Sequence, residues 1–326
     1  MYRLHSILRY MLALAIMTGA VHADFRTNIN FGEALLRTTP APPGYKSARD
    51  AAHAVRKGRV AHAAVPEGIP DNVLVEEDVP YASRENSSLR ADVYRPRNTT
   101  DPSPILVFVH GGAWDHGNED SFRAWGIHYA QRGYVAVAIT YSLVQVAPYP
   151  TALNDVREAF RWAQSQAGNW KADPSRMAIV GQSAGAHLAL MAAYQPDSAP
   201  RVQAVVNFYG PADLTDKPLR TSKAVRKFLG GRRYSRAEDR YREASPMTHT
   251  SPQCPPTLIF HGTVDSRVPV SQSDRLADTL QRNNVPYLYD RIEGWHHAMD
   301  LYAEVNAHCL SVMDLFLDTL LRGEKP

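Results

Sequence analysis

The stretch that decides the fold is AIVGQSAGAHLAL, residues Ala178–Leu190. An apolar run ends at Gly181, Ser183 follows, and a helical pattern resumes at Ala184. A strand that turns directly into a helix strains its corner residue, so the positions two before and two after it must be small. Gly181 and Gly185 meet that requirement. The pattern predicts a sharp turn that presents the Ser183 hydroxyl above a sheet edge, beside the N-terminus of a helix.

The G-x-S-x-G pattern is weak on its own, because a short match with two free positions recurs by chance and an ordinary glycine turn gives the same letters. A serine hydroxyl is also inert until a base activates it. The interpretation therefore depends on the apolar segments that flank Ser183, and on whether the chain supplies a base, an acid and donors for an oxyanion.

Composition limits the classes of protein that the chain can belong to. Its 326 residues are 44% hydrophobic and 21% charged, which suits one substantial core. A net charge of +3 is too small to imply a nucleic-acid partner, and no nucleic-acid motif is present. Cys254 and Cys309 carry no disulfide-framework signal; buried free thiols are favoured over a pair. No feature sets an oligomeric state.

The N-terminus has the pattern of an export signal. Arg3 and Arg9 precede an apolar run over residues 10–20, and VHA at residues 21–23 resembles a cleavage site. We predict a secretory signal peptide over residues 1–23. The run is too short to span a bilayer comfortably, so we expect no stable membrane insertion after cleavage. The mature protein is expected to be secreted or periplasmic.

The rest of the chain alternates between strand and helix patterns. Residues 24–70 are mixed and form an N-terminal extension with a predicted helix over 47–64. Two strands of a hairpin are predicted over 73–79 and 89–94, followed by about six apolar strands that alternate with amphipathic helices. This alternation predicts one doubly wound α/β domain over residues 71–326, with a mostly parallel sheet and helices on both faces. Ligands bind such sheets at the carboxyl ends of the strands.

Two glycines directly follow one of these buried strands. The segment HGGAW begins at residue 110, and its glycines let the backbone approach a ligand with its N–H groups turned inward. An acyl-transfer enzyme needs such donors where a tetrahedral intermediate develops negative charge. We assign this oxyanion role to the N–H groups of Gly112, Ala113 and Ala184. An ordinary glycine turn is the alternative.

An acid and a base also follow strands. Asp265 lies after the strand predicted over 255–262, where a buried carboxylate can hold an imidazole in the required tautomer. Asp213, after the preceding strand, is the less favoured alternative. After the last strand come His296 and His297, and either one can reach Ser183 across the strand ends.

Several segments occur together in the order VHGGAW, YP-ALNDV-EA-RW, ADPSRMAIVGQSAGAHLAL, PPTLIFHGTVDSRVP and GWHHAMD. From about Val73 to Leu321 the chain resembles the α/β-hydrolase superfamily. It is most similar to the esterase/lipase branch with an H-G-G-x-W motif, which includes hormone-sensitive-lipase-like and bacterial feruloyl-esterase-like carboxylesterases. The resemblance implies an α/β-hydrolase fold with Ser183 as nucleophile, Asp265 as acid and His297 as base. His297 is preferred to His296 because a small and then an apolar residue follow it, as in the family.

The resemblance implies a serine carboxylesterase that acts on a small-molecule ester and uses no metal or organic cofactor. An amide-directed hydrolase, such as an arylformamidase or peptidase, is the alternative enzyme. A catalytically silent binding protein of the same fold is the alternative from another class, although such a relative is expected to lose a triad residue.

Two departures from the family pattern stand out. Ala113 replaces a third glycine in the oxyanion loop, which leaves the backbone N–H in place. Ser142 stands where the family often has an arginine that pairs with Asp155. Arg157 or Arg161 is a candidate substitute for that arginine.

An insertion over residues 211–252 is predicted to form a short cap. Its segment Lys217–Glu243 holds ten Lys or Arg and three Asp or Glu residues. A solvated helical face is the favoured interpretation, and a positive rim that attracts acidic substrates is the alternative. Trp114 and Trp295 flank the motifs and are predicted to line the substrate pocket.

Overall fold

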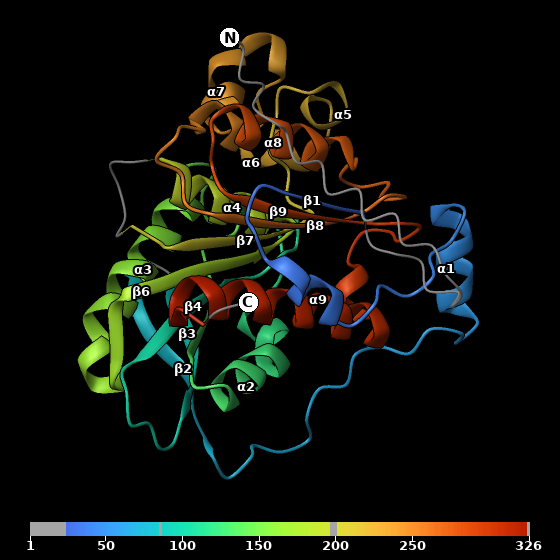
Figure 1. Ribbon diagram of the computed structural model, residues 1–326. Coiled ribbons are helices and arrows are strands. Elements are labelled where there is room, and N and C mark those ends of the chain that lie inside the picture. The colour runs from blue at the N-terminus through green and yellow to red at the C-terminus, as the bar shows by residue number, and fades with distance from the viewer. Residues whose placement is uncertain (1–23, 85–86, 196–200, 325–326) are drawn as a thin grey trace, which may run out of the picture.

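The computed structural model describes residues 24–84, 87–195 and 201–324, and their strands form one sheet (Figure 1). The strand order is β1-β9-β8-β7-β6-β4-β5-β3-β2. The strands are β1 (Asp24–Thr27), β2 (Val73–Arg84), β3 (Ser87–Pro96), β4 (Ser103–Val109), β5 (Val135–Ile139), β6 (Ala172–Gln182), β7 (Ala204–Phe208), β8 (Thr257–Gly262) and β9 (Tyr287–Ile292).

The centre of the sheet is parallel and its edges are antiparallel. Strands β4 to β9 run parallel to one another. At one edge of the sheet, β3 pairs antiparallel with β5 and forms an antiparallel hairpin with β2. At the other edge, β1 pairs antiparallel with β9. Every residue of β4 and β5 is buried, as expected for parallel strands covered on both faces. The predicted doubly wound, mostly parallel α/β fold is confirmed.

Helices cover both faces of the sheet, and alternate strand residues face each layer. Ile105 and Val107 belong to the apolar cluster beneath α3, α4 and α8, whereas Leu106 and Phe108 belong to the cluster beneath α2 and α9. The helices are α1 (Ala48–Arg56), α2 (Arg123–Gln131), α3 (Thr151–Trp170), α4 (Ala184–Tyr194), α5 (Lys217–Arg220), α6 (Lys223–Phe228), α7 (Glu238–Glu243), α8 (Ser271–Arg282) and α9 (Ala303–Leu317).

The N-terminal extension differs from its prediction in two ways. Its first four described residues form β1, which adds an edge strand that a four-residue pattern is too short to signal. The helix predicted over 47–64 is the shorter α1, which begins after Ser47, whose hydroxyl accepts a hydrogen bond from the backbone N–H of Asp50. It ends before Gly58, which has φ +63° and cannot continue a helix.

The predicted cap insertion contains the short helices α5 to α7, which gather with α8 at the top of Figure 1. Its buried apolar side chains join the cluster beneath α3, α4 and α8; they include Leu219, Val225, Phe228, Leu229 and Tyr241. The insertion is therefore packed onto the domain by buried surface as well as by polar contacts.

The two cysteines are free and buried, and they lie in the apolar clusters on opposite faces of the sheet. The predicted free thiols are therefore found. The predicted signal peptide, residues 1–23, lies outside the described residues. In the described part of the chain, no helix is both long and apolar enough to cross a membrane.

Candidate active site

Ser183 stands at the corner between β6 and α4 with φ 51° and ψ −115°. A Cβ atom added at Gly181 would lie 2.5 Å from the carbonyl carbon of Gly185, and one added at Gly185 would lie 2.0 Å from the carbonyl oxygen of Val109. Both distances are too short for any side chain. The two glycines therefore allow the strained corner, as the sequence predicts, and the backbone N–H of Ser183 is held by the carbonyl of Phe208 at 2.9 Å.

His297 and Asp265 complete a chain of hydrogen bonds that begins at Ser183. The Nε2 atom of His297 lies 2.9 Å from the Ser183 Oγ, and its Nδ1 lies 2.6 Å from the Asp265 Oδ2. Asp265 follows β8 and His297 follows β9, so the three side chains meet at the carboxyl ends of parallel strands. This is the arrangement in which an imidazole takes the serine proton while a carboxylate fixes its tautomer.

Both oxygens of the Asp265 carboxylate accept hydrogen bonds. Its Oδ1 accepts hydrogen bonds from the backbone N–H groups of Arg267 at 2.8 Å and Val268 at 3.0 Å. Burial by itself would raise the pKa of the Asp265 carboxyl, but hydrogen bonds from His261 and His297 outweigh it and hold that pKa well below its usual range. Asp265 is therefore a carboxylate throughout the neutral pH range.

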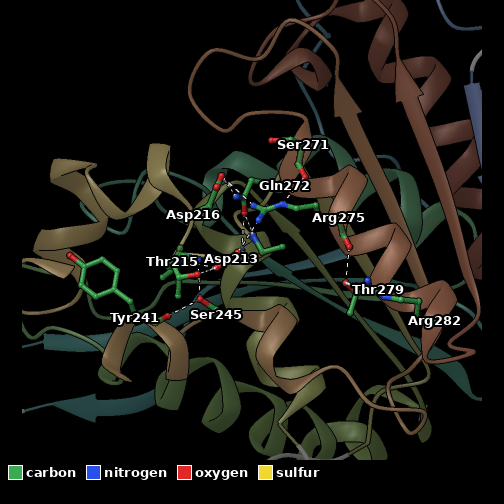
Figure 2. A network of polar contacts seen from close by, with 12 residues as sticks. Asp213, Thr215, Asp216, Tyr241, Ser245, Ser271, Gln272, Arg275, Thr279 and Arg282 are labelled. Carbon is green, nitrogen blue, oxygen red and sulfur yellow. Dashed lines mark hydrogen bonds and ion pairs between the residues drawn. The ribbon is translucent and has the colours of Figure 1, made fainter. Parts of the chain in front are cut away.

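The two alternatives to these residues have other partners. His296 directs its Nδ1 to the carbonyl of His297 and packs its ring edge-on against Tyr302. Asp213 accepts two hydrogen bonds from Thr215 and pairs with Arg275 of α8 at 3.0 Å, in the polar network of Figure 2. Asp213 therefore belongs to the contact between the insertion and α8 rather than to the histidine.

The loop after β4, which the sequence predicts to supply oxyanion donors, lies directly beside Ser183. A Cβ atom added at Gly111 would lie 3.4 Å from the Cβ of Ser183. Gly112, Ala113 and Trp114 have φ values of +114°, +54° and +58°. Such positive φ values are unfavourable for side-chain-bearing residues and cluster at functional sites. At Gly112 a side chain is also excluded, because its Cβ would lie 1.9 Å from the carbonyl oxygen of His116.

Ala184 is the first residue of α4, so its N–H group belongs to the unpaired donors of a helix N-terminus. The sequence predicts that this N–H group acts as an oxyanion donor together with the loop amides of Gly112 and Ala113. The dipole of α4 adds to the positive potential beside the serine.

The two tryptophans have different surroundings. Trp114 stacks on Phe228 of α6 with ring centroids 4.4 Å apart, so it joins the oxyanion loop to the insertion. Trp295 is 2% exposed, packs against Tyr45 and Tyr302, and donates its Nε1–H to the carbonyl of Pro42. The predicted substrate contact of Trp295 is therefore corrected: its ring is enclosed by the N-terminal extension and the segment before α9.

Asp155 has a partner that the sequence does not predict. It is fully buried in α3 and pairs with the guanidinium of Arg84 at the end of β2, whose Nε lies 3.1 Å from Oδ1. Its other oxygen accepts the backbone N–H of Ser142 at 2.8 Å. Arg157, one of the predicted partners, instead contacts Gln195. The sequence offers no local signal for a partner 71 positions away.

A buried polar network behind His297 was also missed. The Tyr209 ring lies 4.6 Å from the His297 ring, and the Tyr209 hydroxyl donates to Asp300. Gln182, the residue before Ser183, donates to the other oxygen of Asp300. Burial raises the pKa of the Asp300 carboxyl. The aspartate in GWHHAMD is the sequence signal that could have identified this network.

Among the described residues, no group of three or more His, Cys, Asp or Glu side chains is placed to hold a metal ion.

The fold and the Ser183–His297–Asp265 geometry define the class of the protein as an α/β hydrolase. The BD-FAE family model matches residues 91–280, and the chain belongs to that family. A probable carboxylic ester hydrolase of Mycobacterium tuberculosis, LipM, is 32% identical over 236 residues, which are 67% of this chain and 54% of LipM. The chain thus spans about half the length of that relative.

Solved structures show the same fold. The propionate-bound esterase Est2 of Thermogutta terrifontis is 26% identical, with a TM-score of 0.64 over 78% of this chain and 97% of the other. The same esterase phosphoramylated by tabun is 25% identical, with a TM-score of 0.64 over 79% and 98% of the two chains. These likenesses show that the chain shares the α/β-hydrolase fold of these esterases.

Proposed function

We propose that the protein is a serine carboxylesterase that hydrolyses small carboxylic esters through an acyl-enzyme. The observation that carries the proposal is the hydrogen-bond chain in which His297 lies 2.9 Å from the Ser183 Oγ and 2.6 Å from the Asp265 carboxylate. The Nδ1–H of His297 is donated to Asp265, which leaves Nε2 free to accept the serine proton.

In the first half of the reaction, the Ser183 oxygen attacks the ester carbonyl while His297 takes its proton. The carbonyl oxygen becomes negatively charged and accepts hydrogen bonds from the N–H groups of Gly112, Ala113 and Ala184. His297 then gives the proton to the leaving alcohol as the C–O bond breaks. The acyl group remains on Ser183 as an ester.

In the second half, a water molecule attacks the acyl carbonyl and His297 takes the proton of that water. The second tetrahedral intermediate uses the same donors, and its collapse returns the proton from His297 to the Ser183 oxygen. The carboxylic acid leaves, and the site returns to its starting state. Asp265 stays ionised throughout and stabilises the imidazolium that forms twice in each cycle.

The esterase Est2 was solved with propionate, so short acyl groups are the first substrates to test. We propose esters with acyl chains of a few carbons, and a comparison of p-nitrophenyl acetate, butyrate and decanoate tests this chain-length range. A rate that rises toward the decanoate would contradict the proposal.

Reaction with a fluorophosphonate tests the nucleophile, because this probe labels an activated serine. Wild-type protein should be labelled at Ser183 and should hydrolyse p-nitrophenyl acetate. Ser183→Ala should be unlabelled and inactive while its melting temperature stays close to that of the wild type. An unlabelled wild-type protein would favour a catalytically silent protein of the same fold.

We also propose that the protein is exported and cleaved before Asp24, which is the first residue of β1. A cleavage at this position would remove the predicted signal peptide and leave the edge strand intact. Determining the N-terminus of the protein secreted or released from the periplasm of an expressing cell tests this. An N-terminus at Met1 in the exported fraction would contradict cleavage.

A further inference from the structure

A second histidine contacts the carboxylate of the candidate triad. His261 is the second-last residue of β8, at the end of the strand that faces the site. It is fully buried, and its Nε2 lies 3.3 Å from the Asp265 Oδ2. This is the same oxygen that lies 2.6 Å from the His297 Nδ1. Two imidazoles therefore converge on one carboxylate oxygen, one from β8 and one from the segment after β9.

The partners of the His261 ring define its hydrogen positions. Its Nε2 faces two acceptors, the Asp265 oxygen and the carbonyl of Val268 at 2.9 Å, so this nitrogen carries a hydrogen. Its Nδ1 lies 2.7 Å from the hydroxyl oxygen of Ser273 in α8, which is fully buried as well. The neutral tautomer with hydrogen on Nε2 satisfies every contact, with Ser273 as donor to Nδ1.

Val268 contacts both His261 and Asp265, and we call these three residues the clamp. Its backbone N–H donates to the Asp265 Oδ1 at 3.0 Å, and its carbonyl accepts from His261. Turning the His261 ring would leave the carbonyl of Val268 and one face of the carboxylate without that N–H donor, and both are buried. The clamp therefore fixes both the position of Asp265 and the distribution of its charge.

We infer that His261, held in orientation by Ser273, is a positioning residue that sets the strength of the Asp265–His297 interaction. This inference rests on the proposed function of the triad. The N–H of His261 partly neutralises the oxygen that pairs with His297. Without it, Asp265 carries more negative charge toward His297, holds the imidazolium proton more tightly and is also freer to move.

Four titratable groups lie around the Asp265 carboxylate and the imidazole that it contacts, and they come from four parts of the fold. They are His261 on β8, His297 after β9, Tyr209 after β7 and Asp300 on the turn before α9. Burial raises the pKa of Tyr209 well above its usual range, so it does not ionise near neutral pH. Asp300 is buried and keeps its hydrogen bonds from Tyr209 and Gln182 in any His261 variant.

The chain allows a matched pair of variants at His261. In His261→Gln the side-chain amide reaches to the place of the ring Nε2 and keeps a donor for Val268 and Asp265. In His261→Asn the shorter amide keeps a polar group near Ser273 and loses that donor. Both variants are polar and of similar size, so a difference between them reports on the N–H group.

The expected result for His261→Asn is a loss in kcat of about tenfold to a hundredfold, typical of one lost hydrogen bond to a charged group, with little change in KM. The acidic limb of its kcat/KM profile should move to higher pH by roughly half to one pH unit. In His261→Gln most of kcat should be retained and the limb should stay near the wild-type position. The chemical shift of the far-downfield proton in the His297–Asp265 hydrogen bond should change in His261→Asn, and it should change less in His261→Gln.

His308→Gln is the control for loss of a buried histidine, because His308 pairs with Asp290 on the other face of the sheet. It should lower the melting temperature and leave the pH limb in place. The inference is overturned if the acidic limb of the kcat/KM profile does not move in His261→Asn. It is also overturned if His261→Asn and His261→Gln have the same kcat and the same pH profile. If His261→Asn does not fold, Ser273→Ala decides, since it should move the limb in the same direction and an unmoved limb there overturns the inference.

The wild-type protein separates this inference from the proposed function. If it is not labelled by the fluorophosphonate and hydrolyses no ester, the proposed function fails and the inference with it. If the wild type is labelled and active while the His261 variants keep its pH profile, the triad stands and only the role of His261 is wrong.

Discussion

At the residue scale, the corner at Ser183 and the loop at residues 112–114 share one property. Each holds side-chain-bearing residues at positive φ, a conformation that costs roughly 1–3 kcal/mol per residue. The fold tolerates this strain because Gly181, Gly185 and Gly112 remove every side chain that would collide there. The strained backbone thus gathers around the atoms proposed to react.

His297 and His296 are adjacent in the sequence but have different environments. The Nε2 of His297 lies 2.9 Å from the Ser183 Oγ, whereas the Nδ1 of His296 faces a backbone carbonyl. We expect His297→Ala to lower kcat for p-nitrophenyl acetate by about a thousandfold or more, because the serine loses its base. His296→Ala should keep kcat within about tenfold of the wild type. Steady-state kinetics of both variants checks this, and an inactive His296→Ala with an active His297→Ala would exchange the two roles.

Asp265 and Asp213 offer the same kind of comparison for the acid. Asp265→Asn should lower kcat by roughly 10⁴-fold, because the amide favours the wrong tautomer of His297. Asp213→Asn should leave kcat nearly unchanged, since Asp213 pairs with Arg275 at the base of the insertion (Figure 2). The measurement is kcat at neutral pH, with the melting temperature as a control for folding. A severe loss of kcat in a well-folded Asp213→Asn would place the acid after β7.

At the element scale, the sequence predicts the helices and strands whose apolar residues recur with a clear period. Helix α4 begins at Ala184, where the helical pattern is predicted to resume, and the predicted core strands are present, because continuous apolar runs and amphipathic helices are local signals. The loops after the strands also bring Ser183, Asp265 and His297 together, because the carboxyl ends of parallel strands meet at one edge.

The features that were missed depend on contacts between distant parts of the chain. β1 is recognisable only when β9 is beside it, since its four residues have no clear pattern of their own. Arg84 finds Asp155 because the long hairpin strand β2 ends beside α3. Trp295 flanks a site motif in sequence, but its ring is turned toward the N-terminal extension.

The Arg84–Asp155 pair should stabilise the junction between β2 and α3. Asp155 is fully buried, so Arg84→Met would leave its charge without the guanidinium and should lower the free energy of unfolding by about 3 kcal/mol. Arg90, on the paired strand β3, forms an exposed ion pair with Asp78, and Arg90→Met should cost less than about 1 kcal/mol. Urea unfolding of both variants measures the difference. Equal losses would show that Asp155 does not depend on Arg84.

At the scale of the whole molecule, buried histidines should make stability depend on pH. Burial lowers the pKa of His110 and of His187 from 6.5 to about 4. Between these values the unfolded chain binds protons that the native state excludes, so stability falls as pH drops below about 6.5. Each of these two residues should remove about 2 kcal/mol of stability between pH 7 and pH 5.

His187→Gln isolates one of these contributions, since glutamine keeps an N–H donor for the carbonyl of Ala244 and does not titrate. Between pH 7 and pH 5, the free energy of unfolding of the variant should fall by about 2 kcal/mol less than that of the wild type. Urea unfolding at both pH values gives the comparison, and it cancels the opposite contribution of His308, whose pKa is raised by its hydrogen bond with Asp290 despite burial. Parallel losses in the wild type and the variant would exclude His187 as a source of the acid sensitivity.

The charge of the insertion has a distribution that the net charge of the molecule conceals. Ten Lys or Arg and three Asp or Glu lie in Lys217–Glu243, while the whole chain carries only +3. Lys227 pairs with Asp115, the residue after Trp114, so this ion pair connects the insertion to the end of the loop beside Ser183. Arg232, Arg233 and Arg236 instead line an open hollow of about 880 Å³ on the surface.

If this positive surface selects substrates, esters that carry a carboxylate should have a higher kcat/KM than matched neutral esters. The preference should fade between low and high salt, because exposed charges are screened over about 8 Å at physiological ionic strength. Reversing Arg232 and Arg233 to glutamate should weaken the preference and leave neutral esters unaffected, since neither residue is part of the triad or the oxyanion loop. The same values for anionic and neutral esters at every salt concentration would make these arginines a solvated surface without a role in selection.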